Sequence, residues 1–417
     1  MKKAIKILLI IIGVVLIALV GIVGYFYVSY NNYSFNDGFQ VNEKNLSYYN
    51  ESYEEARSDF LLKSNEIALK YPDSRTFKIP VSSNVDTNLS IDFCYIRASQ
   101  KTDKIFILSS GVHGVEGHVG SAVQLYFMDN YINDSLLNKT NVLLIHAVNP
   151  YGFKFTRRVT ENNVDLNRNS DIDKDLFSKT NEGYPKVYDL INPEGKANAG
   201  SLANRFFFIK SIVAIAKESM PVLRQAVLQG QYEHPTGLYF GGKDFEPQIK
   251  DMVISIDTIC DAYQTIFAID LHTGYGERAK LHLFPNPVDE PVKKRMEDVF
   301  EGFHIDWGDS DKFYTYSGDF VTYIQKINSD KIFIPMLFEY GTMDSQTTIG
   351  SIKSLHTMIL ENQAEQYAYK SEEDREKIKF DFMEMYNPSS EAWRSHIIDE
   401  TKIIFDKSLK RFTELEF

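Results

Sequence analysis

The chain has 417 residues, of which 43% are hydrophobic, 13% aromatic and 24% charged, and its formal net charge is -12. This composition is typical of a folded protein and argues against a collagenous or disordered chain. The negative charge argues against a protein that binds nucleic acid electrostatically. Two cysteines, Cys94 and Cys260, cannot form a disulfide scaffold or a thiolate-rich metal site, and both lie in apolar segments that predict buried thiols.

The first 30 residues form a separate segment of membrane character. Three lysines within the first six residues precede an apolar run over 7–28, long enough to cross a hydrocarbon core of about 30 Å as a helix. The run is longer than the apolar region of a cleavable signal peptide, and tyrosines at its end resemble an interfacial aromatic belt. The basic flank predicts a cytoplasmic N-terminus. We therefore expect residues 1–30 to be a signal anchor that leaves the rest outside the cytoplasm, with late cleavage as the alternative.

The remaining chain predicts a short tether over 31–48 and one hydrolase-sized domain over 49–417. A capping box at Ser52 opens a helix, and alternating apolar residues over 89–95 predict a half-buried strand. Apolar runs then alternate with helical patterns, which predicts an α/β fold with a mixed, mainly parallel sheet flanked by helices. The expected strands are 104–108, 142–148, 266–271, 281–284 and 332–338, and the expected helices are 118–131, 202–218, 246–263, 288–302, 350–369 and one from 390. The polar stretch 170–200 predicts a surface insertion, and the glycine-rich stretch 229–242 is a candidate pocket rim.

Polar side chains follow several expected strands, at the sheet edge where open α/β folds bind ligands. His113 and Glu116 follow the run 104–108 between glycines, and His272 closes the run 266–271. Two imidazoles and a carboxylate are the ligands of an open, catalytic zinc site. Asp270 stands two residues before His272 and is a candidate to orient a ligand from behind.

Three further charged residues are candidates for catalysis or binding. Glu339 ends the apolar run 332–338, where a carboxylate suits a general base that accepts a proton from water. A strand-end salt bridge is the alternative. Arg158 and Arg168 follow the run 142–148, and guanidinium groups bind carboxylates or developing oxyanions. For each arginine the alternative is a surface position, where the side chain is solvated or paired with a carboxylate.

Other chemistries lack their motifs. The sequence contains no G-x-S-x-G elbow, no phosphate-binding loop and no H-E-x-x-H helix. Neither cysteine stands at a strand end beside a histidine, which argues against a cysteine nucleophile. His118, His146 and His282 fall near the candidate segments, and we expect them to be helix or strand histidines outside the site.

The segments SSGVHGVEGHVGSAVQ, HAVNPYGF, RRVTENNVDLNRN, DLHTGYG and FEYGT together resemble the zinc carboxypeptidase superfamily, with the carboxypeptidase A-like fold. They resemble most closely its branch of uncharacterised bacterial carboxypeptidase-like proteins. The resemblance spans roughly residues 50–410. It implies one Zn²⁺ per chain.

The resemblance also implies a role for each matching position. His113, Glu116 and His272 match the zinc ligands, and Glu339 matches the general base. Asn167 and Arg168 match the pair that binds the terminal carboxylate of the substrate. Arg158 matches the arginine that stabilises the oxyanion, with neighbouring Arg157 as the alternative. Tyr275 and Tyr316 are candidates for a substrate-capping tyrosine.

Two features differ from digestive carboxypeptidases and resemble the deacylases of the same superfamily. Arg158 lies only ten positions before Arg168, and the third ligand stands in D-L-H-T-G. We therefore expect a membrane-anchored, extracytoplasmic zinc metallohydrolase of amide bonds. We expect it to be a metallopeptidase of carboxypeptidase type, whose substrate is a peptide or acyl amino acid with a free carboxylate. An N-acyl amino acid deacylase is the first alternative. A non-catalytic surface protein that binds peptides or wall fragments is the second.

Overall fold

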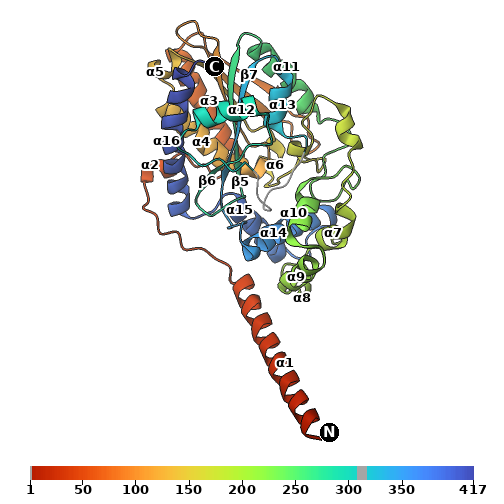
Figure 1. The fold of residues 1–417 in the computed structure, drawn as a ribbon. Coiled ribbons are helices and arrows are strands. Elements are labelled where there is room, and N and C mark those ends of the chain that lie inside the picture. Colours follow the sequence, from red (N-terminus) through yellow and green to blue (C-terminus); the bar gives the residue numbers. More distant parts are fainter. Residues whose placement is uncertain (1, 308–316) are drawn as a thin grey trace.

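The computed structural model describes residues 2–307 and 317–417, and a seven-stranded sheet forms its centre (Figure 1). The strand order is β1-β2-β4-β3-β5-β7-β6. The four strands β4, β3, β5 and β7 are parallel, whereas β1, β2 and β6 join antiparallel. The predicted α/β class with its mixed sheet is confirmed. The bounds are β1 Arg75–Pro80, β2 Ser90–Ile96, β3 Lys104–Ser110, β4 Asn141–His146, β5 Thr265–Thr273, β6 Leu281–Leu283 and β7 Ile332–Tyr340.

One expectation about the strands is wrong, and one strand was missed. β2 is buried along its whole length rather than half-buried, because Cys94 and Ile96 pack on one face of the sheet while Ile91 and Phe93 pack on the other. The strand β1 was not expected from the sequence. It is an edge strand with mostly exposed side chains, and therefore carries little of the apolar pattern by which a strand is recognised.

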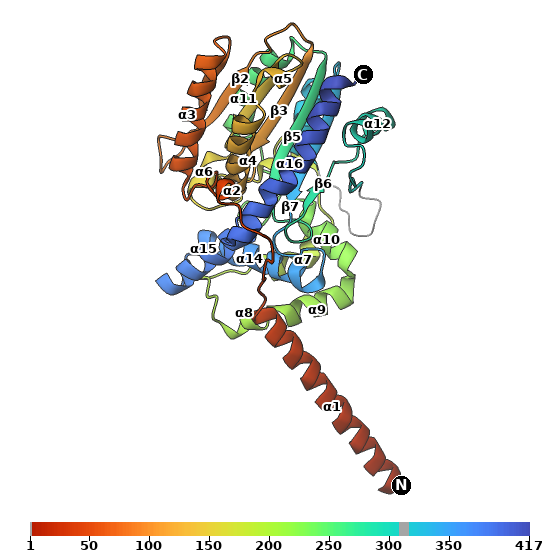
Figure 2. The same cartoon turned by 90° about the vertical axis from the view of Figure 1, so that its left-hand side faces the viewer.

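Helices cover both faces of the sheet (Figure 2). One face packs against α3, α4, α12 and α16, and the other against α11 and α13. Ser52 caps α3 by accepting a hydrogen bond from the Glu55 amide, as the capping box predicts. The bounds are α3 Tyr53–Lys70, α4 Gly117–Asn130, α5 Asp134–Leu137, α6 Pro150–Lys154, α11 Pro247–Cys260, α12 Glu290–Val299, α13 Phe320–Ile327, α14 Thr348–Tyr367, α15 Glu372–Tyr386 and α16 Glu391–Glu414. Both cysteines are buried free thiols.

A helical insertion lies between β4 and β5. The stretch 170–200, expected as surface loop, contains α7, whose Val187 and Ile191 are buried. The expected helix over 202–218 is interrupted at Phe206, which joins α8 to α9. Together these helices pack on α14 and form an apolar cluster beside the sheet. The bounds are α7 Tyr184–Ile191, α8 Leu202–Arg205, α9 Phe207–Glu218 and α10 Met220–Leu228.

The N-terminal helix α1 (Lys2–Asn31) projects from the body next to α8 and α9, as Figures 1 and 2 both show. Among the described residues it is the one helix long and apolar enough to cross a membrane, and its apolar window is not buried in the protein. The expected tether contains a four-residue helix, α2 (Glu43–Leu46). Asn45 on α2 is buried against α16 and donates to the Ser395 carbonyl at 3.0 Å.

Candidate metal centre and active site

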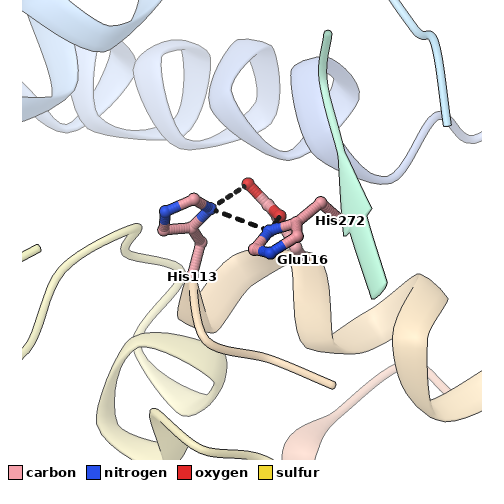
Figure 3. A group of neighbouring side chains, drawn as sticks. All are labelled: His113, Glu116 and His272. Atoms are coloured by element: carbon pink, nitrogen blue, oxygen red, sulfur yellow. Dashed lines mark hydrogen bonds and ion pairs between the residues drawn. The ribbon is translucent and has the colours of Figure 1, made fainter. Parts of the chain in front are cut away.

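Three predicted ligands converge at the carboxyl ends of β3 and β5 (Figure 3). His113 Nδ1 lies 2.9 Å from Glu116 Oε1, and His272 Nδ1 lies 2.9 Å from Glu116 Oε2. The two Nδ1 atoms are 3.2 Å apart. All three side chains are buried, and their donor atoms lie within 4.8 Å of one another. Two imidazoles and one carboxylate with this convergence suit a divalent cation such as zinc.

Each imidazole also contacts a second carboxylate through its Nε2 atom. His272 Nε2 lies 2.7 Å from Asp270 Oδ2, and His113 Nε2 lies 3.3 Å from Asp165 Oδ1. Both contacts leave Nδ1 directed toward Glu116, which is the orientation that a ligating histidine needs. The Asp270 interaction was anticipated from its position, whereas Asp165 was not. The signal for Asp165 was its place in the D-L-N-R-N segment beside two site candidates.

Glycines shape the loop that carries His113 and Glu116. Gly111 follows β3 with a φ of +68°, a left-handed conformation that favours glycine. A Cβ atom at Gly114 would overlap the backbone of Gly152 on α6. The loop therefore lies directly against α6, which fixes the direction in which both ligands leave the backbone.

The charges of this cluster are balanced only in part. Burial alone would raise the pKa of Glu116, but the two imidazoles lower it to about 2. Burial likewise favours a higher pKa for Asp165, yet the Arg158 guanidinium brings it well below its usual range. With neutral imidazoles and Glu339 left aside, three carboxylates (Glu116, Asp165 and Asp270) and two guanidinium groups (Arg158 and Arg168) leave a formal charge of -1. A protonated imidazole or a divalent cation offsets that charge.

The structure distinguishes the two adjacent arginines. Arg158 faces the cluster, with Nε 3.0 Å from Asp165 Oδ2 and Nη2 2.6 Å from His113 Nε2. Arg157 points away, and its Nε donates to Glu361 Oε1 at 2.9 Å. Arg158 is therefore the arginine placed to meet a substrate oxygen.

The predicted carboxylate-binding pair lies in the same site. Asn167 Nδ2 is 3.3 Å from His272 Nε2, and its Oδ1 accepts a hydrogen bond from the Phe320 amide. Arg168 is buried and donates to the carbonyls of Asn167 and Leu228. Both residues line the cavity described below.

Glu339 stands across from His272 on the neighbouring strand β7. Its Oε2 atom is buried and has no hydrogen-bond partner among the described residues. Burial, reinforced by the charge of Glu116, raises the pKa of Glu339 to about 8 against the opposing charges of His272 and Arg158. The carboxyl group also accepts a hydrogen bond from the backbone of Tyr275, which leaves Oε2 as the free oxygen beside the ligand cluster. A free carboxyl oxygen at this place is what a proton acceptor for water requires.

Aromatic side chains complete the site. Tyr239, within the expected rim 229–242, and Tyr386, at the end of α15, both line the cavity. The Arg158 guanidinium lies 5.2 Å from the centre of the Tyr239 ring. Tyr386 was missed because it is distant in sequence from every recognised motif. Of the two candidate capping residues, Tyr275 lines the cavity and Tyr316 falls outside the described residues.

A cavity of about 160 Å³ connects these residues to the helical insertion. Its polar end contains His113, Glu116, Arg158, Asn167, Arg168 and Glu339. The remainder is mostly apolar and is lined from α7, α9, α10 and α14. The histidines expected outside the site lie elsewhere: His118 beside the Asn50 carbonyl, His146 beside Ser121 and His282 beside Asp306.

Comparison with known proteins identifies the family. Residues 49–400 match the family described as "Protein of unknown function (DUF2817)". The chain belongs to this family. A search of curated protein sequences finds no match.

Solved structures similar to the chain include three carboxypeptidase-related proteins. Bovine thrombin-activatable fibrinolysis inhibitor is 14% identical, with 76% of this chain and 98% of that chain covered and a TM-score of 0.37. Carboxypeptidase A from Helicoverpa armigera is 12% identical, with 73% and 72% covered and a TM-score of 0.36. A metallo-carboxypeptidase from Pseudomonas aeruginosa is 11% identical, with 73% and 67% covered and a TM-score of 0.36. Likeness of this degree carries no argument about substrate.

Proposed function

We propose that this DUF2817 protein is a zinc-dependent hydrolase of amide bonds, of the carboxypeptidase-like kind, held at the outer side of a membrane by α1. The observation that carries the proposal is the convergence of His113, Glu116 and His272 opposite Glu339, whose buried Oε2 atom has no hydrogen-bond partner among the described residues. A binding protein has no chemical need for a buried carboxyl oxygen without a partner next to three metal donors, because burial of such an atom is costly.

Each remaining side chain has a role in that chemistry. When bound, Zn²⁺ would polarise the amide carbonyl and acidify water. Glu339 accepts the proton of the attacking water and then passes a proton to the leaving amine nitrogen. Asn167 and Arg168 bind the free carboxylate of the substrate, which orients the amide bond between Glu339 and the ligands.

Arg158 stabilises the oxygen that becomes negatively charged. Once Nδ1 of His113 serves as a ligand, its Nε2 carries a hydrogen, and Arg158 Nη2 cannot remain 2.6 Å away because both groups are then donors. The guanidinium therefore moves away from the imidazole of His113 while it stays paired with Asp165. This movement brings the guanidinium toward the carbonyl oxygen of a substrate in the cavity.

The first test is the metal content of the full-length protein in detergent, with His272→Ala beside it. We expect about one zinc per chain in the wild type, as for a three-ligand catalytic site. The variant should lose the metal because one of three ligands is gone. A wild-type protein that takes up no metal after zinc is supplied would contradict the proposal.

The second test separates proton transfer from metal binding. Glu339→Gln should lower turnover by about 10²- to 10⁴-fold, the usual contribution of a general base, and should retain zinc. Glu246→Gln is the matched control, because Glu246 is also a buried carboxylate but bonds to Asn162 away from the cavity. Full turnover in Glu339→Gln would show that another group accepts the proton.

Substrate class and location need their own measurements. A panel of peptides and N-acyl amino acids, assayed with the zinc-loaded protein, separates the carboxypeptidase from the deacylase. Membrane fractionation combined with mass spectrometry of the N-terminus tests the anchor. Release of soluble protein after cleavage near residue 30 would show that the N-terminal segment is a cleaved signal peptide and not an anchor.

A further inference from the structure

The two ends of the cavity differ in polarity and in exposure. At the polar end His113, Glu116 and Arg168 are buried, and Arg168 is only 2% exposed. At the other end the cavity is lined by Leu190, Ile215, Met220 and Leu355, all partly exposed to solvent. The carboxylate-binding end is therefore closed, and the apolar end is where the cavity reaches the surface.

This arrangement gives the substrate a direction. A substrate carboxylate at Asn167 and Arg168 occupies the closed end, so the acyl side of the scissile amide extends toward α9 and α10. The lining of that path is mainly apolar, with Ser211, Arg224, Ser351 and Ser354 as its polar side chains. An extended peptide would pair few of its backbone amides there, and an unpaired buried amide is costly. A hydrocarbon chain has no such groups and gains by leaving water.

The apolar end of the cavity lies next to the membrane helix. Phe26 and Tyr30 of α1 pack on Phe208 of α9, with ring centres 6.3 and 5.7 Å apart. The Asn31 side chain donates to the Arg205 carbonyl at 3.2 Å. Phe26 and Tyr30 belong to the same apolar cluster as Ile215, which lines the cavity. The helix α9 thus lies between the C-terminal end of α1 and the cavity.

The outer surface of α8 and α9 has the character of a membrane interface. Leu202 is 74% exposed and Val213 is 62% exposed, and Phe206 and Ile212 are exposed beside them. Residues 196–217 contain four basic residues and no acidic residue, although Lys217 pairs with the adjacent Glu218. Apolar side chains flanked by lysine and arginine are typical of helices that lie in the headgroup layer. Contact with α1 places this surface where the membrane helix leaves the bilayer.

From these observations we infer that the substrate is an N-acyl amino acid with a long acyl chain, drawn from the membrane. The acyl chain occupies the apolar part of the cavity between α7, α9, α10 and α14, and the amino acid carboxylate binds at Asn167 and Arg168. This inference rests on the proposed function for the identity of the scissile bond. The reaction adds water across the amide, with the hydroxyl joining the acyl carbon and a proton joining the nitrogen, and releases a fatty acid and an amino acid.

The test measures binding, so that it does not depend on turnover. Full-length Glu339→Gln protein in lipid nanodiscs is titrated with N-acetylglycine, N-octanoylglycine and N-dodecanoylglycine by calorimetry. After subtraction of the heat measured with empty nanodiscs, affinity should rise with chain length, by up to about fourfold for each methylene group that leaves water. Equal affinities for the three ligands, or no binding of any of them, would overturn the inference.

Two variants of α9 test where the acyl chain of the ligand binds. Ile215→Trp fills the apolar end of the cavity, so the affinity for N-dodecanoylglycine should fall to that for N-acetylglycine. Val213→Trp adds the same ring two residues away on the exposed surface and should retain the dependence on chain length. Chain-length dependence that survives Ile215→Trp would also overturn the inference. Failure of the proposed function would appear separately, as absent zinc or absent turnover in the wild type.

Discussion

The strand-end floor of the cavity and its helical wall differ in chemistry. The floor exposes His113, Glu116, Arg158 and Glu339 to the cavity, and short polar contacts join these residues to Asp165, Asp270 and His272 behind them. The wall consists of α7, α9 and α10, which contribute mainly apolar side chains that are partly exposed. Directional contacts tolerate little displacement, whereas apolar packing tolerates substitutions that conserve volume. We therefore expect substitutions in the floor to be tolerated less well than substitutions of similar volume in the wall.

The largest expected effect comes from adding one methyl group beneath the floor. Gly114→Ala places a Cβ against the Gly152 backbone, which cannot move aside as a side chain does. We expect a loss of roughly 3 kcal/mol in the free energy of unfolding, at the upper end of overpacking costs. Gly200→Ala is the control in the segment that leads into α8, where a Cβ meets only the Asn198 side chain at 3.7 Å. Guanidinium unfolding of both variants measures the difference, and similar midpoints would contradict a rigid floor.

A smaller effect is expected when one carboxylate of the floor loses its charge. Asp165→Asn leaves Arg158 without its partner and weakens the support of His113. Zinc affinity should fall by about 10- to 100-fold, as for other residues that orient metal ligands. Asp171→Asn is the control, since Asp171 is equally buried but pairs with Lys326. Competition with a chelator measures the zinc affinity of both variants. Unchanged affinity in Asp165→Asn would show that His113 keeps its orientation without the Asp165 carboxylate.

The smallest effect concerns pH and originates in the sheet that carries the floor. His146 on β4 is stacked on Phe60, and burial lowers its pKa from 6.5 to about 3. Between these two values the unfolded chain binds a proton that the folded chain does not. His146 therefore contributes no destabilisation above about pH 6.5, and its cost grows as the pH falls toward 3. Between pH 7 and 5 we expect a loss of about 2 kcal/mol from this group.

His146→Asn should make that dependence shallower. Unfolding midpoints of wild type and variant between pH 7 and 5 give the comparison. Equal slopes in the two proteins would mean that other groups dominate the pH dependence. On the helical side of the cavity, His356 of α14 stacks on Phe207 of α9, and burial lowers its pKa to about 3 as well. Both sides of the cavity therefore contribute a pH dependence of the same sign.

Much of the sheet and of the candidate ligand set could be predicted from the sequence. Buried parallel strands appear as continuous apolar runs, so β3, β4, β5 and β7 were found close to their observed bounds. Ligands that stand directly after such runs must meet at one edge of the sheet, and His113, Glu116 and His272 do so. Expectations failed where this local signal is weak, as at the exposed edge strand β1 and at the break between α8 and α9.

Local sequence therefore determined the fold class, the membrane-type helix and the ligand candidates, because each leaves a pattern within a few residues. Tertiary structure alone decided that Arg158 rather than Arg157 faces the ligands, that Asp165 supports His113, and that Tyr386 from α15 completes the pocket. It also decided that α9 lies between α1 and the cavity. These relations join residues tens to hundreds of positions apart, and they arise from the packing of whole helices on the sheet, which no short-range periodicity encodes.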